Sequence, residues 1–531
     1  MTSPAGSRST PTPTPDAPPK AVGLRSERGP VLLALMLATG LVAIDGTIIA
    51  TAVPSIVRDV GGFTSFPWLF SAYLLTQAVT VPLYGRFADV AGRRPVLLLG
   101  IALFLLGSVL CGAAGSMPLL IAARAVQGLG AGAVQPMTIT IVGDLYSLEE
   151  RARVQGYLAG VWGVSSVVGP AMGGVFSEYL SWRWIFFVNL PIGGLAAWML
   201  VRTFREQVTR RSHAFDHTGA VLLTLGCSAL ILGLLEGGVA WPWTSAPGVG
   251  LPVVGVVLLA AFVLAERRAV EPVLPLWVFG RRVLVAGNLV SLAVGVLLIG
   301  VTSYAPTYVQ GVIGTGPLVA GFAVAALTVG WPIAATGSGR VYLRIGFRAT
   351  VSAGAVVITV GALGCTLLGV GSTVWQVAGT CFVLGIGLGL SSGPAIVAVQ
   401  SSVGWDRRGV VTATSMFARS IGSAVGVAVF GAVANATLTG RLTHAPAALA
   451  GQLPTSQDGA VTALESRPAG LTPAALAYLR QSLTAVTHHV FLGLLVVAVV
   501  AVGAALLLPR HVTPLTFGPP AQAGPPAGAA G

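Results

Sequence analysis

The sequence predicts an all-α integral membrane protein with fourteen spanning helices, arranged as two six-helix halves with two further helices inserted between them. Of its 531 residues, 54% are hydrophobic and only 9% are charged, whereas soluble domains carry about 25% charged residues. The apolar residues fall in long runs, and a helix needs roughly 20 such residues to cross about 30 Å of hydrocarbon. Two similar loop sequences, one in each part of the chain, indicate an internal repeat.

The elements follow in order from the N-terminus. Residues 1–29 are rich in Pro, Thr and Ser and contain no long apolar run, so we expect a disordered cytoplasmic tail. The expected spans lie at approximately 30–53, 66–84, 95–115, 118–143, 154–176, 184–203, 217–238, 247–265, 283–308, 317–337, 349–370, 373–399, 409–434 and 487–508.

These spans divide the chain into four regions and a second tail. The N-terminal half covers 30–204, the inserted pair with its linkers 205–282, the C-terminal half 283–508, and a second disordered cytoplasmic tail 509–531. Within the C-terminal half, a long polar outer loop is expected at 435–486, with one short helix around 472–484. Most other connections are short, as is usual between packed helices.

Arginine residues predict the orientation. They fill the loops that follow the even-numbered spans, whereas the opposite short loops hold only Arg58 and Arg183. Positive side chains in short loops stay in the cytoplasm. Because the number of spans is even, both termini are expected in the cytoplasm.

The charge and the cysteines exclude other classes. The net charge of +13 comes from short Arg clusters between apolar runs, which is a topology signal, and we expect no nucleic-acid partner. The four cysteines (Cys111, Cys227, Cys365 and Cys381) lie inside apolar runs without C-x-x-C spacing. We therefore predict packing roles for them, with neither a disulfide framework nor a metal site.

An internal sequence repeat indicates that the chain is built like a transporter. GRFADVAGRR at 85–94 aligns without a gap on GRVYLRIGFR at 339–348, and the first follows span 2 while the second follows span 10. The matched pairs are Gly85 with Gly339, Arg86 with Arg340, Gly92 with Gly346, and Arg94 with Arg348. Repeats related by an axis along the membrane normal are a known way to build transporters, so spans 7 and 8 are interpreted as the insertion.

The first copy concentrates charge in one loop. Gly85 and Gly92 permit a tight turn and helix ends, while Arg86, Arg93 and Arg94 hold the loop in the cytoplasm. Asp89 is the single acid, and an acid is favoured near a helix N-terminus by about 0.3 to 1 kcal/mol. The second copy has Leu343 at the position of Asp89, so any contact that Asp89 makes is expected to be asymmetric.

An acid and an arginine in different predicted spans are candidates for a coupling site. Asp45 in span 1 and Arg124 in span 4 are placed at similar depth, and charges within a membrane are functional by default. We predict that Asp45 binds a coupling proton, with a purely structural ion pair as the alternative. Glu236, near the outer end of span 7, is either a second carboxylate in a cation pathway or a side chain that reaches the outer water.

Other ionisable and glycine-rich positions receive simpler interpretations. Asp144, Glu266 and Asp406 stand beside Arg at helix ends and are expected to be solvated loop charges. GLGAGA at 128–133 fits a dinucleotide fingerprint only formally, because that motif needs a preceding strand. No Walker A sequence occurs, so we expect no ATP use and no cofactor.

Span 5 contains a glycine- and proline-rich stretch, and we expect it to interrupt or bend the helix, because proline removes one backbone hydrogen bond. Close packing alone is the alternative. The residues are Gly163, Gly169, Pro170, Gly173 and Gly174.

Five stretches together indicate a family. GRFADVAGRR resembles the loop signature of the major facilitator superfamily. Four others resemble its fourteen-span drug:proton antiporter branch: AIDGTIIATAVP, RAVQGLGAG, GVSSVVGPAMGG and WRWIFFVNLPIG. The resemblance implies proton coupling at Asp45 and Arg124, and an exporter from the span 5 motif. It also implies that Asp89 contacts the start of span 13 near Arg408 and Gly409, as a latch for the outward-facing state.

We therefore predict a transporter of the bacterial plasma membrane that exports amphiphilic or cationic drugs or antibiotics in exchange for protons. Its partners would be this small molecule, protons and the lipid bilayer, and we expect a monomer. Tyr73, Gln77, Gln127 and Trp162 are candidate substrate-binding residues, although most are expected to pack in the core.

Three alternatives remain. The first is a dedicated exporter of one endogenous metabolite, and the second is a transport-inactive membrane sensor. A membrane enzyme is disfavoured, because neither H-E-x-x-H nor G-x-S-x-G occurs and His488 and His489 are adjacent at a span end.

Overall fold

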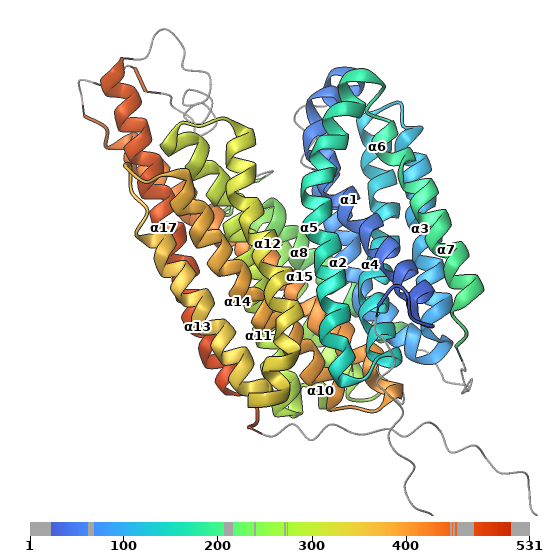
Figure 1. Ribbon diagram of the computed structural model, residues 1–531. Coiled ribbons are helices and arrows are strands. Elements are labelled where there is room, and N and C mark those ends of the chain that lie inside the picture. The colour runs from blue at the N-terminus through green and yellow to red at the C-terminus, as the bar shows by residue number, and fades with distance from the viewer. Residues whose placement is uncertain are drawn as a thin grey trace, which may run out of the picture.

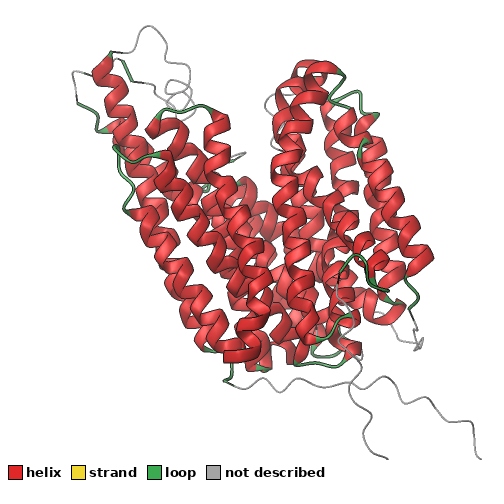
Figure 2. Cartoon of the chain, viewed as in Figure 1, coloured by secondary structure: helices red, strands yellow, loops and turns green. Residues whose placement is uncertain are grey.

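The computed structural model describes residues 23–61, 68–206, 216–237, 241–269, 272, 274, 276–446, 449, 452–453 and 472–510. Regular structure in these residues is helical throughout, with no β-strand (Figure 2). Residues 1–22 of the first predicted tail and 511–531 of the second lie outside the described residues, as does most of the centre of the predicted outer loop.

The N-terminal half contains α1 (Gly29–Val60), α2 (Trp68–Ala91), α3 (Arg93–Gly112), α4 (Met117–Leu145), α5 (Leu148–Tyr179), α6 (Trp184–Phe187) and α7 (Asn189–Thr203). Three helices follow in the inserted segment: α8 (His217–Glu236), α9 (Ala246–Glu266) and the short α10 (Trp277–Gly280).

The C-terminal half contains α11 (Arg282–Tyr308), α12 (Pro317–Ile345), α13 (Phe347–Thr366), α14 (Val374–Ser401), α15 (Arg408–Thr443) and α17 (Pro473–Leu506). A π-helical turn at Val309–Ile313 extends α11, and a 3-10 turn at Trp405–Arg407 precedes α15.

Twelve membrane-crossing segments in the described residues are long and apolar enough to span a bilayer. Two more helices are consistent with a count of fourteen. One is α2, which carries Arg86 and Asp89 at one end, and the other is α8, whose apolar stretch at Thr218–Leu234 is short. The chain is therefore a multi-pass membrane protein.

The helices form two bundles that meet along two seams. In the N-terminal bundle α4 packs on α2 and α3, and in the C-terminal bundle α14 packs on α12 and α13. The seams are α2 against α15 and α5 against α12. Figure 1 shows the two bundles close together at the lower end and diverging toward the upper end.

The inserted helices attach at one seam. α8 and α9 pack on each other, and α8 also packs on α2 and α15. Leu223 of α8 shares a buried cluster with Ala78 of α2 and Ala424 of α15. α9 buries only a small part of its apolar surface inside the protein, so α8 covers the α2–α15 seam and α9 lies outside it.

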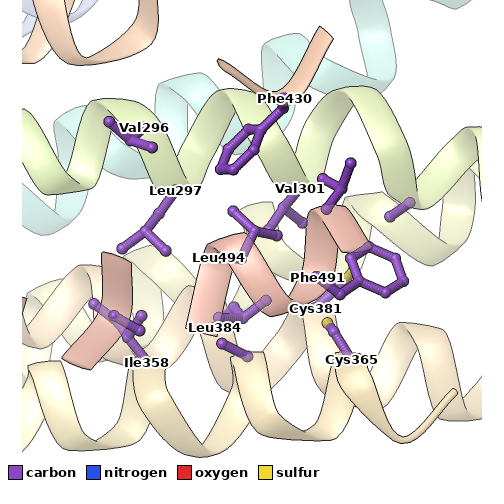
Figure 3. Close-up of a cluster of buried hydrophobic side chains, with 14 of the residues drawn as sticks. Val296, Leu297, Val301, Ile358, Cys365, Cys381, Leu384, Phe430, Phe491 and Leu494 are labelled. Carbon is purple, nitrogen blue, oxygen red and sulfur yellow. The ribbon is translucent and has the colours of Figure 1, made fainter. Parts of the chain in front are cut away.

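A large apolar cluster holds the C-terminal bundle together. Figure 3 shows Phe430, Phe491 and Leu494 packed among side chains of neighbouring helices, with Cys365 and Cys381 nearby. All four cysteines are buried and free, in agreement with the predicted packing role.

The two repeat loops share one backbone feature. Gly92 lies directly before α3 with φ +99°, and Gly346 lies directly before α13 with φ +84°. Both values fall in the region that glycine adopts without a Cβ penalty. The paired glycines of the repeat therefore occupy equivalent turns, which supports the alignment.

Two expectations about helix limits were wrong. α5 runs without interruption from Leu148 to Tyr179, because one missing N–H removes only a single hydrogen bond from an otherwise continuous ladder. The outer loop expected at 435–486 is shorter, since α15 continues to Thr443 and α17 begins at Pro473. Thr472 caps α17 through its Oγ1, which accepts from Ala475 N, and Pro473 suits the first helical position.

The described chain ends lie at the same end of the bundle. Near the N-terminus, Arg28 Nη1 donates to Leu145 O at 2.6 Å. Near the C-terminus, Arg282 Nε donates to Leu507 O at 2.7 Å. Both contacts fall at the end that carries the Arg-rich loops.

Candidate functional site

A buried charge cluster joins α1, α4 and α7. Asp45 is 1% exposed, and Arg124 Nη1 donates to its Oδ2 at 2.7 Å. Its Oδ1 accepts from Gln127 Nε2 at 2.7 Å and from Asn189 Nδ2 at 3.1 Å. The two oxygens of the carboxylate therefore have three donors, as a charge buried in a membrane requires.

Arg124 is equally well bonded. Its Nε donates to Leu69 O at 3.1 Å, and its Nη1 also donates to Gln127 Oε1 at 2.7 Å. The guanidinium lies over the ring of Tyr73, 4.2 Å from the centroid, where a cation–π contact is favourable. Positions 124 and 127 share one face of α4, because residues three apart are neighbours on a helix.

Two members of this cluster were missed from the sequence. Asn189 lies within the WRWIFFVNLPIG stretch but was not singled out, and Ser108 is a small polar residue with no sequence signal. Ser108 Oγ accepts from Gln127 Nε2 at 2.9 Å and from Asn189 Nδ2 at 3.2 Å. Ser108 therefore holds the side-chain amides of Gln127 and Asn189 against Asp45.

The four candidate substrate residues do not form one pocket. Tyr73 and Gln127 are buried members of the Asp45 cluster. Gln77 is partly exposed on α2, and Trp162 is 41% exposed on α5. The structure therefore brings two of the four to the predicted coupling site and leaves the other two elsewhere.

Glu236 lies apart from the Asp45 cluster. It ends α8, which packs on α2 and α15, and among the described residues no hydrogen bond or ion pair joins it to the cluster. Its side chain is 2% exposed, so it does not extend into the outer water as the alternative interpretation held.

Asp89 connects the two bundles at their closed end. Its Oδ1 accepts from Gly409 N at 3.1 Å, and its Oδ2 accepts from Val410 N at 2.9 Å. These amides belong to the first turn of α15, where the helix dipole favours an anion. The contact predicted near Arg408 and Gly409 is therefore present.

Asp89 belongs to a chain of ion pairs. Arg93 Nη2 lies 3.1 Å from Asp89 Oδ1, and Arg93 Nε lies 3.2 Å from Asp144 Oδ2. Arg408 Nη1 lies 3.0 Å from Asp144 Oδ1. Arg93 also stacks on the ring of Trp405 and donates to its carbonyl at 2.6 Å. This set, Asp89, Arg93, Asp144, Arg408 and Trp405, is called the inner contact below.

The expectation that Asp144 and Glu266 are solvated was wrong. Asp144 is held between two arginines from different bundles. Glu266 is buried and its Oε1 accepts from Leu274 N at 3.3 Å. A carboxylate at a helix end can turn inward when donors face it, which loop position alone does not reveal. The side chain of Asp406 lies outside the described residues.

The remaining loop residues support the inner contact. Gly85 lies so close to α15 that an added Cβ would overlap Ala413 Cβ. Glu206, which the sequence did not single out, caps α3 by accepting from Arg93 N at 2.9 Å and from Arg94 N at 2.8 Å. Arg86 is partly exposed on α2.

The glycines of α5 lie against different neighbouring helices. A Cβ on Gly163 would lie 3.0 Å from Thr328 O of α12, and one on Gly169 would overlap Thr47 Oγ1 of α1. A Cβ on Gly174 would meet nothing within 4 Å. Gly163 thus permits close packing across the α5–α12 seam, and Gly169 permits it within the N-terminal bundle. Gly173 is buried, and the helix continues through Pro170.

The structure also reveals Arg419, which the sequence analysis overlooked. It is the single charged residue of predicted span 13, and it lies eleven residues into α15, about 16 Å of rise from Arg408. A scan for every charge inside a predicted span would have found it.

The chain was compared with known proteins. Residues 35–427 match the family model described as Major Facilitator Superfamily. The multidrug transporter protein MdtP of Bacillus subtilis is 32% identical over 509 residues, which cover 92% of this chain and 94% of that protein. Multidrug resistance protein 3 of the same organism is 33% identical, over 78% of this chain and 81% of that protein. The human organic anion transporter MFSD10 shares the fold, with a TM-score of 0.58 at 15% identity, over 89% of this chain and 99% of that one.

Proposed function

The chain belongs to the major facilitator superfamily, and we propose that it exports amphiphilic compounds across the bacterial plasma membrane in exchange for protons. Two relatives that align with most of the chain carry multidrug names, and they support an efflux transporter and not an enzyme. Proton coupling rests on one observation, the carboxylate of Asp45 buried and bonded to Arg124.

In this proposal Asp45 carries the coupling proton. Protonation would remove the negative charge that holds Arg124, and Gln127 and Asn189 would then bond a neutral acid. A buried arginine that loses its partner is costly, so the two protonation states favour different arrangements of α1 and α4. Alternating access would expose the carboxyl group to one side of the membrane and then to the other.

The inner contact provides the second part of the cycle. It joins the bundles through Asp89 at the end that we assign to the cytoplasm. It must break before that end opens, so we propose that it stabilises the outward-facing state. Binding of the compound or release of the proton would then shift the balance between states, since a ligand acts through its different affinity for each.

The energy source is proposed to be the proton gradient, without ATP or a cofactor, and the working unit a monomer in the bilayer. The span 5 motif supports the direction of transport through its resemblance to exporters. Gly163 places α5 against α12 of the other bundle, where a small residue allows close approach and sliding between the bundles, and Gly169 places α5 close to α1.

Inverted membrane vesicles with an acidic interior test this function. Proton release is followed with a pH-sensitive dye while a panel of amphiphilic drugs is added. The variants are Asp45→Asn and the matched control Asp59→Asn, which makes the same change at the far end of α1. We expect drug-dependent proton release from the wild type and from Asp59→Asn, and none from Asp45→Asn. Equal release from Asp45→Asn would refute the coupling role.

A further inference from the structure

Arg419 is a charge inside the C-terminal bundle without a partner among the described residues. No hydrogen bond or ion pair joins its guanidinium to any of them, and the side chain is partly exposed. A charge inside a membrane protein is costly unless it is paired or reaches water. The position therefore calls for a ligand or for water.

The face of α15 that carries Arg419 meets α4 at its inner end and α11 further along the helix. Arg408, Thr412, Ser415 and Arg419 are spaced by four, three and four residues, so they form one stripe along the helix. At the inner end this stripe meets α4, because Arg408 Nη1 donates to Gly143 O at 2.8 Å. Gln400 Nε2 donates both to Thr412 Oγ1 at 2.9 Å and to Ile139 O of α4 at 3.3 Å.

Arg419 continues this stripe toward the outer side. The two bundles diverge in that direction (Figure 1). At the level of Arg419 the same face packs on α11, because an added Cβ on Gly295 would overlap Arg419 O, and the Arg419 side chain is partly exposed.

Among the described residues, no carboxylate forms an ion pair with Arg419. Residues 283–508 contain only three acids, Asp406, Asp458 and Glu465, and all three lie outside the expected spans. Asp45 is already bonded to Arg124. Glu236 belongs to α8, which packs on the side of α15 that carries Val410, and position 410 lies nine residues from 419, half a turn around the helix.

Within the described part of the chain, two further hydrogen-bond donors, one on α11 and one on α4, also have no acceptor. Asn288 of α11 accepts from Ser415 Oγ at 2.8 Å, and its own Nδ2 is buried without a partner. Gln135 lies one turn from Ile139 on α4, and its Nε2 is also buried without a partner. Three helices that pack on one another, α4 and α11 each against α15, thus each carry a donor without a matching acceptor among the described residues.

We propose that Arg419, assisted by Asn288 and Gln135, binds an anionic group of the transported compound, such as a carboxylate. The guanidinium fork matches the two oxygens of a carboxylate, and an ionised acceptor forms a stronger bond than a neutral one. This proposal rests on the export function above and narrows its substrate class to amphiphiles that carry an acidic group, zwitterions included.

Chemical labelling tests the binding step with the full chain in membranes. Phenylglyoxal modifies accessible arginines, and peptide mass spectrometry reports each site. The probes are rhodamine B and its ethyl ester, which differ by one carboxylate. We expect Arg419 to be labelled, and rhodamine B to slow its labelling about tenfold more than the ester does. Arg340, exposed on α12, serves as the control that neither dye protects. Equal protection of Arg419 by the two dyes, or none, would overturn the proposal.

Transport by variants separates this proposal from the proposed function. Arg419→Gln should raise the concentration of rhodamine B needed for half-maximal export about tenfold relative to the ester. Arg419→Lys should restore part of the preference, and Arg340→Gln should change neither dye. If Arg419→Gln lost export of both dyes equally, Arg419 would have a structural role and the anion site would be refuted. Carboxylate-selective protection of Arg419 without proton-coupled export would support the anion site and refute the proposed function.

Discussion

The two bundles treat an arginine within a spanning helix in opposite ways. Arg124 in the N-terminal bundle bonds Asp45, Gln127 and the carbonyl of Leu69, and stacks on Tyr73. Arg419 in the C-terminal bundle has no such partner among the described residues. One bundle therefore neutralises its charge internally, in line with the proposed proton coupling, and the other leaves its charge for the proposed anionic ligand.

A similar contrast appears at the inner ends of α5 and α15. α5 satisfies its own N-terminus, because Ser147 and Glu150 form a capping box. α15 has no side-chain cap of its own, and Asp89 from the other bundle bonds its first amides. Opening the inner end would leave α5 capped and α15 uncapped, so the repeat is asymmetric in energy as well as in sequence.

The largest expected effect separates the two arginines. Arg124→Ala leaves Asp45 buried without its counter-ion, and we expect a loss of about 3 to 5 kcal/mol in stability. Arg419→Ala removes a charge without leaving a partner behind, so its cost should stay below about 1 kcal/mol. Denaturant unfolding of the purified proteins in detergent measures both. Equal losses would mean that Arg419 has a structural partner.

The inner contact is tested by a pair of variants at equivalent repeat positions. Asp89→Asn weakens the bonds to Gly409 and Val410 and the pairing with Arg93, which together are worth about 1.5 to 3 kcal/mol. The outward-facing population should fall accordingly. Leu343→Asn changes the matched site of the second copy, which is 45% exposed, and should leave the population unchanged. Distances between spin labels on the two bundles would report the shift, and an unchanged distance distribution in Asp89→Asn would refute the latch.

A smaller effect is expected from the packing of α5. Gly169→Ala would force a methyl group into Thr47 of α1, and overpacking of this kind costs about 1 to 2 kcal/mol. Gly160→Ala on the same helix meets nothing within 4 Å and should be tolerated. Thermal unfolding in detergent compares the two. If both variants unfolded at the wild-type temperature, the contact between Gly169 and Thr47 would be looser than the structure shows.

The features predicted from the sequence have two sources. Apolar runs locate the helices through composition and spacing, whereas the contact of Asp89 with α15 was predicted from the resemblance of the charged loop to a family signature. Hydropathy marks the part of a helix inside the bilayer and not its ends, which explains the unexpected lengths of α15 and α17.

The residues that were missed have a different cause. Ser108 and Asn189 are neutral and small among apolar neighbours, so only the packing of α3, α4 and α7 shows that they face Asp45. Asp144 sits at a helix end, and its inward orientation depends on Arg93 and Arg408 from distant parts of the chain.

The smallest effect concerns a second acid of α1 that is paired in water. Asp59 lies beyond the membrane-spanning part of α1 at Gly29–Ile49, and Arg183 Nη1 lies 2.6 Å from its Oδ2. Hydrogen bonds from Arg183 and then Trp182 lower the pKa of Asp59 below its ordinary value. A lowered pKa means that the stabilisation is present above the ordinary pKa and is lost as the pH falls through the lowered one.

Stability measured between pH 5 and 8 should therefore show no step from Asp59, and Asp59→Asn should lower the melting temperature only slightly, because exposed pairs contribute little. Asp45→Asn should lower it more, since the same change on the same helix leaves Arg124 buried without an anion. If the two variants lost equal stability, burial would not be what distinguishes the two ion pairs of α1, and the internal neutralisation assigned to the N-terminal bundle would fail.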